Sequence, residues 1–329
     1  MKIVVTGAAG FIGSHTCERL VSAGHEVVGI DCFSDYLYPE EPKRVNAAAL
    51  AASLPEDKFR LIEADICDVE TMTKVLDSSV DVLCHLAALA GVRPSLVAPQ
   101  KYIRTNLEGT TTLYEACRKS GIERIVFASS SSVYGVVDKQ THTKAFSESD
   151  LCLAPASPYA ATKRSGELLS STYRDLYGMG ISCLRFFTVF GPRQRPDMAM
   201  HKFVKAITNG EPIPVFGDGS SRRDYTYIDD IVSGVVAAIE RVAPASYSIY
   251  NLGGTVTTSL TEMIEIIEEV LGKKAVINRL PMQPGDVPIT FADISRAQEE
   301  LDYQPTTTVR QGLKHFWVWY QSQFGKGTP

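Results

Sequence analysis

The chain has 329 residues, 44% hydrophobic and 22% charged, enough for one large core plus a smaller lobe, which excludes a largely disordered protein. Lys and Arg number 33 against 38 Asp and Glu, so the net charge of −5 leaves no basic field to hold a nucleic acid. No apolar stretch is long enough to span a bilayer, and we therefore expect a cytoplasmic protein that does not bind membranes.

In the first half of the chain, short β-branched runs alternate with longer amphipathic segments. This alternation predicts an α/β fold, a parallel sheet whose strands are joined by crossover helices. The expected strands are residues 3–6, 26–30, 59–64, 80–86, 124–128 and 181–187. Apolar residues at helical spacing predict a helix over 102–117, stopped by Gly121. Ser157 is placed to cap a further helix over 158–177, which Gly178 ends.

After residue 187 the sequence becomes rich in proline and glycine. These residues predict loops around one helix at 199–209, and they are Pro192, Pro196, Pro212, Pro214, Gly217 and Gly219. A helix over 227–242 and a strand over 248–252 follow, so the chain is expected to return to the first lobe. The predicted first lobe is residues 1–187 with 227–252, and the predicted second lobe is 188–226 with 253–329.

The segment TGAAGFIG lies where the first strand turns into a helix. Its glycines let the backbone approach a pyrophosphate at the helix N-terminus, and they are Gly7, Gly10 and Gly13. Asp31 ends the second strand, 18 residues after Gly13, where a carboxylate accepts hydrogen bonds from a ribose and repels a 2′-phosphate. NAD is therefore favoured over NADP. Asp65 and Ile66 close the third strand, and Asp65 either binds the adenine edge or caps a turn.

Tyr159 and Lys163 stand four residues apart, so they share one face of the predicted helix. An ammonium beside a phenol favours the phenolate, which would let the tyrosine act as a base near neutral pH. The same pair occurs by chance in many chains. Here it follows the dinucleotide segment and the run SSSSVYG at the end of the fifth strand.

The segments TGAAGFIG, SSSSVYG, YAATK and FGDGSSRRDYTYIDD occur in this order. With them the chain resembles the NAD-dependent epimerase/dehydratase family of extended short-chain dehydrogenases over nearly its whole length. The resemblance implies a Rossmann-type doubly wound sheet with a smaller C-terminal α/β substrate-binding lobe. It also implies that Ser130 binds the reacting hydroxyl, Tyr159 is the acid/base, Lys163 holds the nicotinamide ribose and Asn106 supports the site. The further cofactor-binding residues expected are Phe11, Ile12, Leu86, Ala87, Ala88, Ser129 and Phe186.

The residues before VYG indicate the type of reaction. Dehydratases of the family carry Asp-Glu there and decarboxylases carry Glu, whereas this chain has Ser131 and Ser132. The resemblance therefore favours plain epimerisation. The segments LRFFTVFGPRQRPDM and MQPGDVP resemble those of UDP-glucuronate 4-epimerases, while UDP-glucose 4-epimerases have Asn in place of Thr188. Thr188, Ser130, Ser131 and Ser132 could surround a sugar carboxylate with neutral donors.

Arginines are expected at the diphosphate of a UDP-sugar. By resemblance Arg195 and Arg223 would contact it, as forked donors suit phosphate oxygens. Arg93 either lies near the phosphates or forms a surface salt bridge, and Arg222 is expected to be solvated. The residues implied around the uridine are Asp286 at the ribose and Val215 and Phe216 at the uracil.

The expected activity is interconversion of UDP-glucuronate and UDP-galacturonate with bound NAD, through a 4-keto intermediate. A UDP-glucose 4-epimerase and a UDP-glucuronate decarboxylase are the enzymatic alternatives, and a regulatory protein that binds NAD without chemistry is the other. By resemblance, helices over 101–119 and 158–177 form a homodimer interface. The seven cysteines and the histidines lack metal-ligand spacing, so free thiols and no metal are expected.

Overall fold

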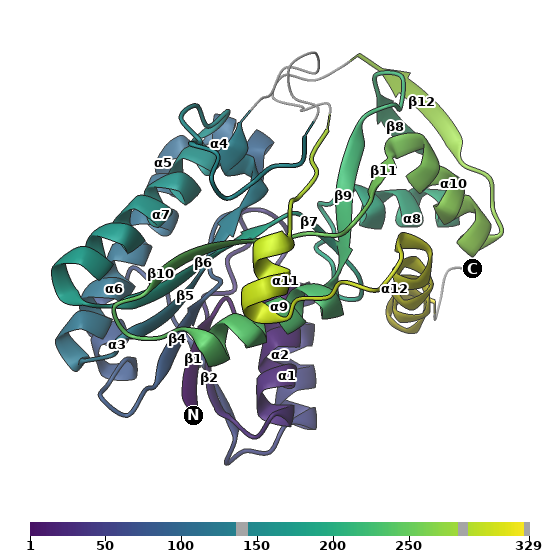
Figure 1. Ribbon diagram of the computed structural model, residues 1–329. Helices are drawn as coiled ribbons and strands as arrows, with labels where there is room; N and C mark the ends of the chain where they lie inside the picture. Colours follow the sequence, from purple (N-terminus) through teal and green to yellow (C-terminus); the bar gives the residue numbers. More distant parts are fainter. Residues whose placement is uncertain (136–143, 282–288, 326–329) are drawn as a thin grey trace.

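The structure is a computed structural model that describes residues 1–135, 144–281 and 289–325 (Figure 1). Its main element is a seven-stranded parallel sheet in the order β10-β6-β5-β4-β1-β2-β3. These strands are β1 (Lys2–Thr6), β2 (Glu26–Asp31), β3 (Phe59–Glu63), β4 (Val82–His85), β5 (Arg124–Ser130), β6 (Gly180–Phe186) and β10 (Tyr247–Leu252). Each predicted strand is present within two residues of its expected bounds. β10 pairs with β6, so residues 247–252 lie in the same sheet as the strands of the first half of the chain.

Helices cover both faces of this sheet (Figure 1). Side chains alternate between two cores along each buried strand, so that Val5 packs into the core shared with α1 and α9, and Val4 into the core shared with α6. The helices of the first lobe are α1 (Phe11–Ser22), α2 (Glu41–Ser53), α3 (Val69–Val75), α4 (Val92–Val97), α5 (Pro99–Ile103), α6 (Gly109–Ser120), α7 (Pro158–Tyr177) and α9 (Ile228–Arg241). Two tight segments, the π-turn η1 (Arg104–Glu108) and the 3₁₀-turn η2 (Ser131–Tyr134), complete it.

The predicted single helix over 102–117 is wrong in detail, since α5, η1 and α6 share this stretch. At the junction of η1 and α6, Gly109 lies against Ile66, where a Cβ would come within 2.6 Å of the isoleucine side chain. A π-turn inserts an extra residue per turn and re-aims its side chains. The predicted bounds of α7 are confirmed: Ser157 Oγ accepts from Ala160 N at 3.1 Å, and Gly178 ends the helix with φ +68°.

Among the described residues, two small sheets and three helices form the other part of the molecule. The sheets have the orders β11-β9-β7 and β12-β8. The strands are β7 (Thr188–Phe190), β8 (Pro212–Phe216), β9 (Arg222–Tyr227), β11 (Thr257–Ser259) and β12 (Val276–Leu280). The helices of this part are α8 (Ala199–Asn209), α10 (Leu260–Leu271) and α12 (Val309–Phe324), whereas α11 (Ser295–Leu301) packs against α9 and β10 of the first lobe. The predicted helix at 199–209 is confirmed.

Pro212 and Pro214 do not mark a loop as predicted, because both lie in strand β8. They are exposed, whereas Ile213 and Val215 between them are buried, giving the alternation of a half-buried strand. A strand in a two-stranded sheet has one unpaired edge, and a proline without N–H is tolerated there.

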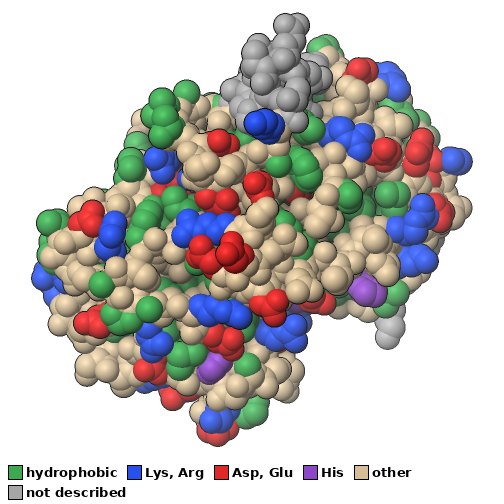
Figure 2. Space-filling model, in the orientation of Figure 1, with side chains coloured by type: hydrophobic (Ala, Val, Ile, Leu, Met, Phe, Trp, Pro, Cys, Tyr) green, Lys and Arg blue, Asp and Glu red, His purple; other side chains and the backbone are tan. Residues whose placement is uncertain are grey.

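Acidic and basic side chains are interspersed over the face of the molecule seen in Figure 2, with no continuous basic surface on it. Within the described ranges, every helix is too short or too polar to traverse a lipid bilayer.

Candidate active site

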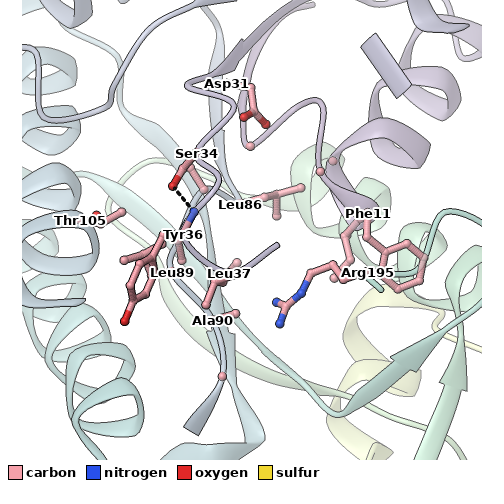
Figure 3. A pocket seen from close by; sticks show the side chains of 18 of the residues that line it. Phe11, Asp31, Ser34, Tyr36, Leu37, Leu86, Leu89, Ala90, Thr105 and Arg195 are labelled. Carbon is pink, nitrogen blue, oxygen red and sulfur yellow. Dashed lines mark hydrogen bonds between the residues drawn. The ribbon is translucent and has the colours of Figure 1, made fainter. Parts of the chain in front are cut away.

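A cavity of about 590 Å³ lies at the carboxyl ends of the central strands (Figure 3). It receives residues from the β1–α1 turn, from the ends of β2, β4 and β5, from α7 and from the segment after β6. The predicted site residues that line it are Gly7, Gly10, Phe11, Ile12, Gly13, Asp31, Asp65, Ile66, Leu86, Ala87, Ala88, Ser129, Ser130, Tyr159, Lys163, Phe186 and Arg195. The fold thus brings together segments spread over nearly 190 residues of sequence.

The glycine-rich turn has the close packing that the sequence predicts. Gly7 has φ +71°, and a Cβ on Gly13 would lie 2.0 Å from the carbonyl oxygen of Gly7. Gly10 caps α1 without a side-chain hydrogen bond, so the first N–H groups of the helix have no side-chain partner at the cavity. Open backbone donors in a cradle that a side chain would fill fit the pyrophosphate of a dinucleotide.

Asp31 is held rigidly at the end of β2. Its carboxylate accepts from Ala9 N at 3.1 Å and from Phe33 N at 2.9 Å. Burial raises the pKa of Asp31, and the two backbone donors oppose this shift. Asp65 Oδ1 accepts from Cys67 N at 2.9 Å, so this residue caps a turn and also borders the cavity. The position of Asp31 suits the ribose role that we predicted.

The Tyr159–Lys163 pair differs from our expectation in its electrostatics. Lys163 Nζ donates to the carbonyl oxygen of Ala128 at 2.6 Å, and burial lowers its pKa to about 7. Burial also raises the pKa of Tyr159, while the Ser130 hydroxyl and the Arg195 guanidinium act to lower it. The predicted lowering of the phenol pKa by Lys163 is therefore wrong for the protein alone. The hydroxyl and the arginine are the groups that favour the phenolate.

Asn106 supports the cavity wall from behind. Its side chain accepts from Leu89 N at 2.8 Å and donates to Leu89 O at 2.9 Å and to Thr162 Oγ1 at 3.0 Å. These bonds tie the π-turn to α7 and to the backbone after β4. Asn106 is buried and does not line the cavity, so we assign it a supporting position.

The serine run continues from β5 into η2. Ser132 donates to Ser130 Oγ from its backbone N at 3.2 Å and from its hydroxyl at 2.9 Å. Ser130 pairs in register with Phe186 on β6, and Thr188 follows two residues later at the start of β7. The half-exposed residues Ser131, Ser132 and Thr188 thus lie just beyond the carboxyl ends of β5 and β6. They are outside the cavity lining itself.

A buried ionic network lies directly behind these strand ends. Arg185 and Glu167, 1% and 0% exposed, form a bidentate pair at 2.8 and 3.0 Å. Glu167 also accepts from Ser129 Oγ at 2.6 Å, and Arg185 donates to the Tyr134 hydroxyl at 2.9 Å. Tyr134 in turn donates to Asn251 Oδ1 at 2.7 Å. The network joins β5, η2, β6, α7 and β10, and the sequence analysis did not identify it.

Of the four arginines considered in the sequence, Arg195 is the one that lines the cavity. Its guanidinium forms a bidentate pair with Asp197 at 2.9 and 2.7 Å and points into the cavity in Figure 3. Arg93 lies with its guanidinium 5.0 Å from the ring centre of Phe216. Arg222 is partly exposed, as predicted in part, and it also donates to Thr257 and pairs with Glu262 at 3.1 Å.

The other predicted substrate residues lie away from the cavity lining. Arg223 donates to the carbonyl oxygen of Arg222 at 2.9 Å. Val215 is buried in the hydrophobic core, so only its backbone could face a ligand. Asp286 and the segment MQPGDVP lie outside the described residues. Among the described residues, no group of three or more His, Cys, Asp or Glu side chains could hold a metal ion.

The segment after Asp31 forms one cavity wall, which was not predicted from the sequence. Ser34, Tyr36 and Tyr38 line the cavity, as does Lys43 from α2. The Lys43 ammonium lies 4.1 Å from the ring centre of Tyr38. Their place in the sequence could have predicted this role. Residues that follow the carboxyl end of β2, next to the glycine-rich turn, face the same crevice as that turn.

Comparison with known proteins places the chain among enzymes. The model of the NAD dependent epimerase/dehydratase family matches residues 3–253. The chain is 42% identical to UDP-glucuronate 4-epimerase 4 of Arabidopsis thaliana, over 98% of this chain and 76% of that protein. It is 40% identical to UDP-glucuronate 4-epimerase of Thermodesulfobacterium geofontis, over 96% and 95%. The Bacillus cereus UDP-glucuronic acid 4-epimerase, solved with UDP-glucuronic acid and NAD, superposes with a TM-score of 0.91 at 40% identity, covering 98% and 100%.

Breaking the buried ion pair should destabilise the fold. Glu167→Gln leaves the Arg185 guanidinium without its counter-charge, and we expect the free energy of unfolding to fall by about 3 kcal/mol. Urea denaturation measures this change. The matched control Glu70→Gln, in an exposed pair with Lys74, should cost under about 1 kcal/mol, and equal losses in both variants would contradict the assignment.

The lowered pKa of Lys163 predicts a pH-dependent stability. Folded Lys163 releases its proton near pH 7, whereas an unfolded lysine keeps it to about pH 10.4. The unfolded state therefore binds more protons in this window, and stability should rise with pH relative to Lys163→Met, by at most about 1.4 kcal/mol per pH unit. Denaturation of the cofactor-free proteins from pH 7 to 10 tests this. A pH-independent difference would exclude the shift.

Proposed function

The chain belongs to the NAD-dependent epimerase/dehydratase family, and we propose that it interconverts UDP-glucuronate and UDP-galacturonate with bound NAD. The match to UDP-glucuronate 4-epimerases at about 40% identity over nearly the whole chain carries this conclusion. The site chemistry agrees with it. Ser130, Tyr159 and Lys163 converge at the cavity, and hydroxyls rather than carboxylates follow Ser130.

The chain's own residues account for the movement of the proton. Tyr159 removes the proton of the C4 hydroxyl, and Ser130 holds this hydroxyl in reach of the phenol. When bound, NAD supplies the acceptor for the C4 hydride and afterwards returns the hydride. The 4-keto sugar must present its opposite face before that return, while the diphosphate stays anchored on Arg195. Tyr159 then gives the proton back to the C4 oxygen, so no net oxidation occurs.

The hydroxyl cluster of Ser131, Ser132 and Thr188 also protects the 4-keto intermediate from decarboxylation. The 4-keto intermediate of glucuronate is a β-keto acid, which loses carbon dioxide when the bond to its carboxylate stands perpendicular to the carbonyl plane. Donors that fix the carboxylate away from this angle suppress the loss. We assign this role to Ser131, Ser132 and Thr188, which lie at the adjoining ends of β5 and β6.

The arrangement of the two lobes supports a proposal for the ligand that each one binds. We propose that residues 188–226 and 253–329 bind the nucleotide sugar, with Arg223, Phe216 and Asp286 facing its UDP moiety, and that 1–187 with 227–252 bind NAD. We also propose a cytoplasmic location. All seven cysteines are free thiols, as suits a reducing compartment.

A homodimer is proposed through α6 and α7. The exposed apolar side chains near these helices include Ile103, Leu168, Leu176 and Tyr177, with exposed fractions of 52%, 54%, 65% and 47%. Several such residues on neighbouring helices are typical of an interface.

Sedimentation should therefore show a dimer for the wild-type protein and a monomer for Leu168→Glu, since a carboxylate would be buried without a partner. Leu153→Glu, at an exposed loop position, serves as the control and should stay dimeric. A monomeric wild-type protein would refute the dimer.

The activity test compares nucleotide sugars directly. Purified enzyme incubated with UDP-glucuronate should yield UDP-galacturonate, detected by chromatography, without net NADH. UDP-glucose should react much more slowly, and Tyr159→Phe should lose about 100-fold or more in kcat. UDP-galactose formation, UDP-pentose as the main product, or NAD binding without turnover would instead identify the UDP-glucose epimerase, decarboxylase or regulatory alternative.

Removing one of the hydroxyls proposed to hold the sugar carboxylate should divert the 4-keto intermediate towards loss of carbon dioxide. In Thr188→Ala or Ser131→Ala, we expect the ratio of UDP-pentose to UDP-galacturonate to rise roughly fivefold for each lost hydrogen bond. Mass spectrometry of the products measures this ratio. The control Thr172→Ala, exposed on α7, should leave it unchanged. Variants that lose activity without any pentose would rule out the protective role.

A further inference from the structure

The segment that carries Arg195 into the cavity is anchored to the NAD-binding helix α1. His15 Nε2 donates to the carbonyl oxygen of Pro192 at 3.0 Å, and Glu18 Oε1 accepts from Arg193 Nη2 at 2.7 Å. His15 and Glu18 share one face of α1 with Phe11, whose side chain lines the cavity. These two contacts join residues more than 170 positions apart in the sequence. They hold Pro192 and Arg193, which shortly precede Arg195.

The opposite side of the segment is held by α8 and β7. Gln194, 2% exposed, donates to Val189 O at 3.1 Å, and its own carbonyl oxygen accepts from His201 Nδ1 at 2.9 Å. The His201 ring packs edge-on against Phe316 and Tyr320 of α12. The second lobe therefore fixes Gln194, while α1 fixes Pro192 and Arg193.

The backbone explains why these anchors are needed. Arg193 has φ +63°, a left-handed conformation that is unfavourable for a residue with a Cβ. A conformation of this kind persists when surrounding contacts enforce it. Asp197 orients the Arg195 guanidinium. The backbone position of Arg195, in contrast, is set by residues 192–194.

We propose that His15 and Glu18 are positioning residues that hold Arg195 within reach of the substrate diphosphate. The inference rests on the proposed function, since it takes Arg195 as a diphosphate ligand. Neither residue touches the reacting atoms. The helix that cradles the cofactor pyrophosphate thereby also sets the affinity for the anionic part of the substrate.

This role predicts a selective defect. Displacing Arg195 should weaken every ligand that carries the diphosphate and leave uridine alone unaffected. A contact made equally in the ground state and the transition state changes KM and not kcat. His15→Phe keeps the ring volume beside Phe11 but removes the donor, and Glu18→Gln removes the charge that Arg193 meets.

The experiment is calorimetric titration of the NAD-loaded enzyme with UDP and, separately, with uridine. For His15→Phe and Glu18→Gln we expect the Kd for UDP to rise about tenfold, the effect of one charged hydrogen bond, with the Kd for uridine unchanged. His15→Gln, whose amide can still donate to Pro192 O, should restore most of the affinity. With UDP-glucuronate as substrate, KM should rise by the larger factor and kcat should fall by a smaller one, because the displaced Arg195 also favours the phenolate of Tyr159.

The control is Glu26→Gln, which breaks an ion pair with Lys2 at the far end of the same sheet and should leave all these values unchanged. Wild-type affinity for UDP in both variants would overturn the proposal, as would an equal loss for UDP and uridine, which would indicate general unfolding of the site. Failure of the proposed function would be separate, because wild-type enzyme would then not convert UDP-glucuronate whatever the variants bind.

Discussion

The ion pair between Glu167 and Arg185 is the interaction on which the arrangement of the site depends. It is closed to solvent, and such a pair is stable only when its partners hold each other in good geometry. Glu167 lies one turn after Lys163 on α7, and Arg185 lies on β6 just before the strand reaches the cavity. Because Ser129 bonds to the same carboxylate, the base-bearing helix and the hydroxyl-bearing strand end are fixed to one buried charge.

Around this pair, burial opposes the ionisation that catalysis needs. Desolvation raises the pKa of Tyr159 and lowers that of Lys163, so neither group carries its charge without cost in the protein alone. Ser130 and Arg195 offset part of the cost for the phenolate. In the proposed function Arg195 also binds the substrate diphosphate, so a single cation would link substrate binding to activation of Tyr159.

Local patterns in the sequence were sufficient to predict the central sheet and the helix that carries Tyr159 and Lys163. β-branched runs between amphipathic segments specify parallel strands, and Ser157 and Gly178 mark both ends of α7. Prediction failed where tertiary contacts override local signals. Pro212 is tolerated at a strand edge, and the anchors of the Arg195 segment, such as His15, come from residues too distant in sequence to leave a local pattern. The direction of the Lys163 ammonium likewise depends on a carbonyl that only the fold brings near.

The central claim is that one hydrogen leaves C4 and returns to the opposite face of the same carbon, while Tyr159 moves the proton. The most direct measurement uses UDP-glucuronate deuterated at C4, with the product followed by NMR and mass spectrometry. The account predicts UDP-galacturonate that keeps the deuterium at C4, with no loss to solvent. Product that has exchanged its C4 deuterium for solvent hydrogen, or inversion at a carbon other than C4, would contradict it.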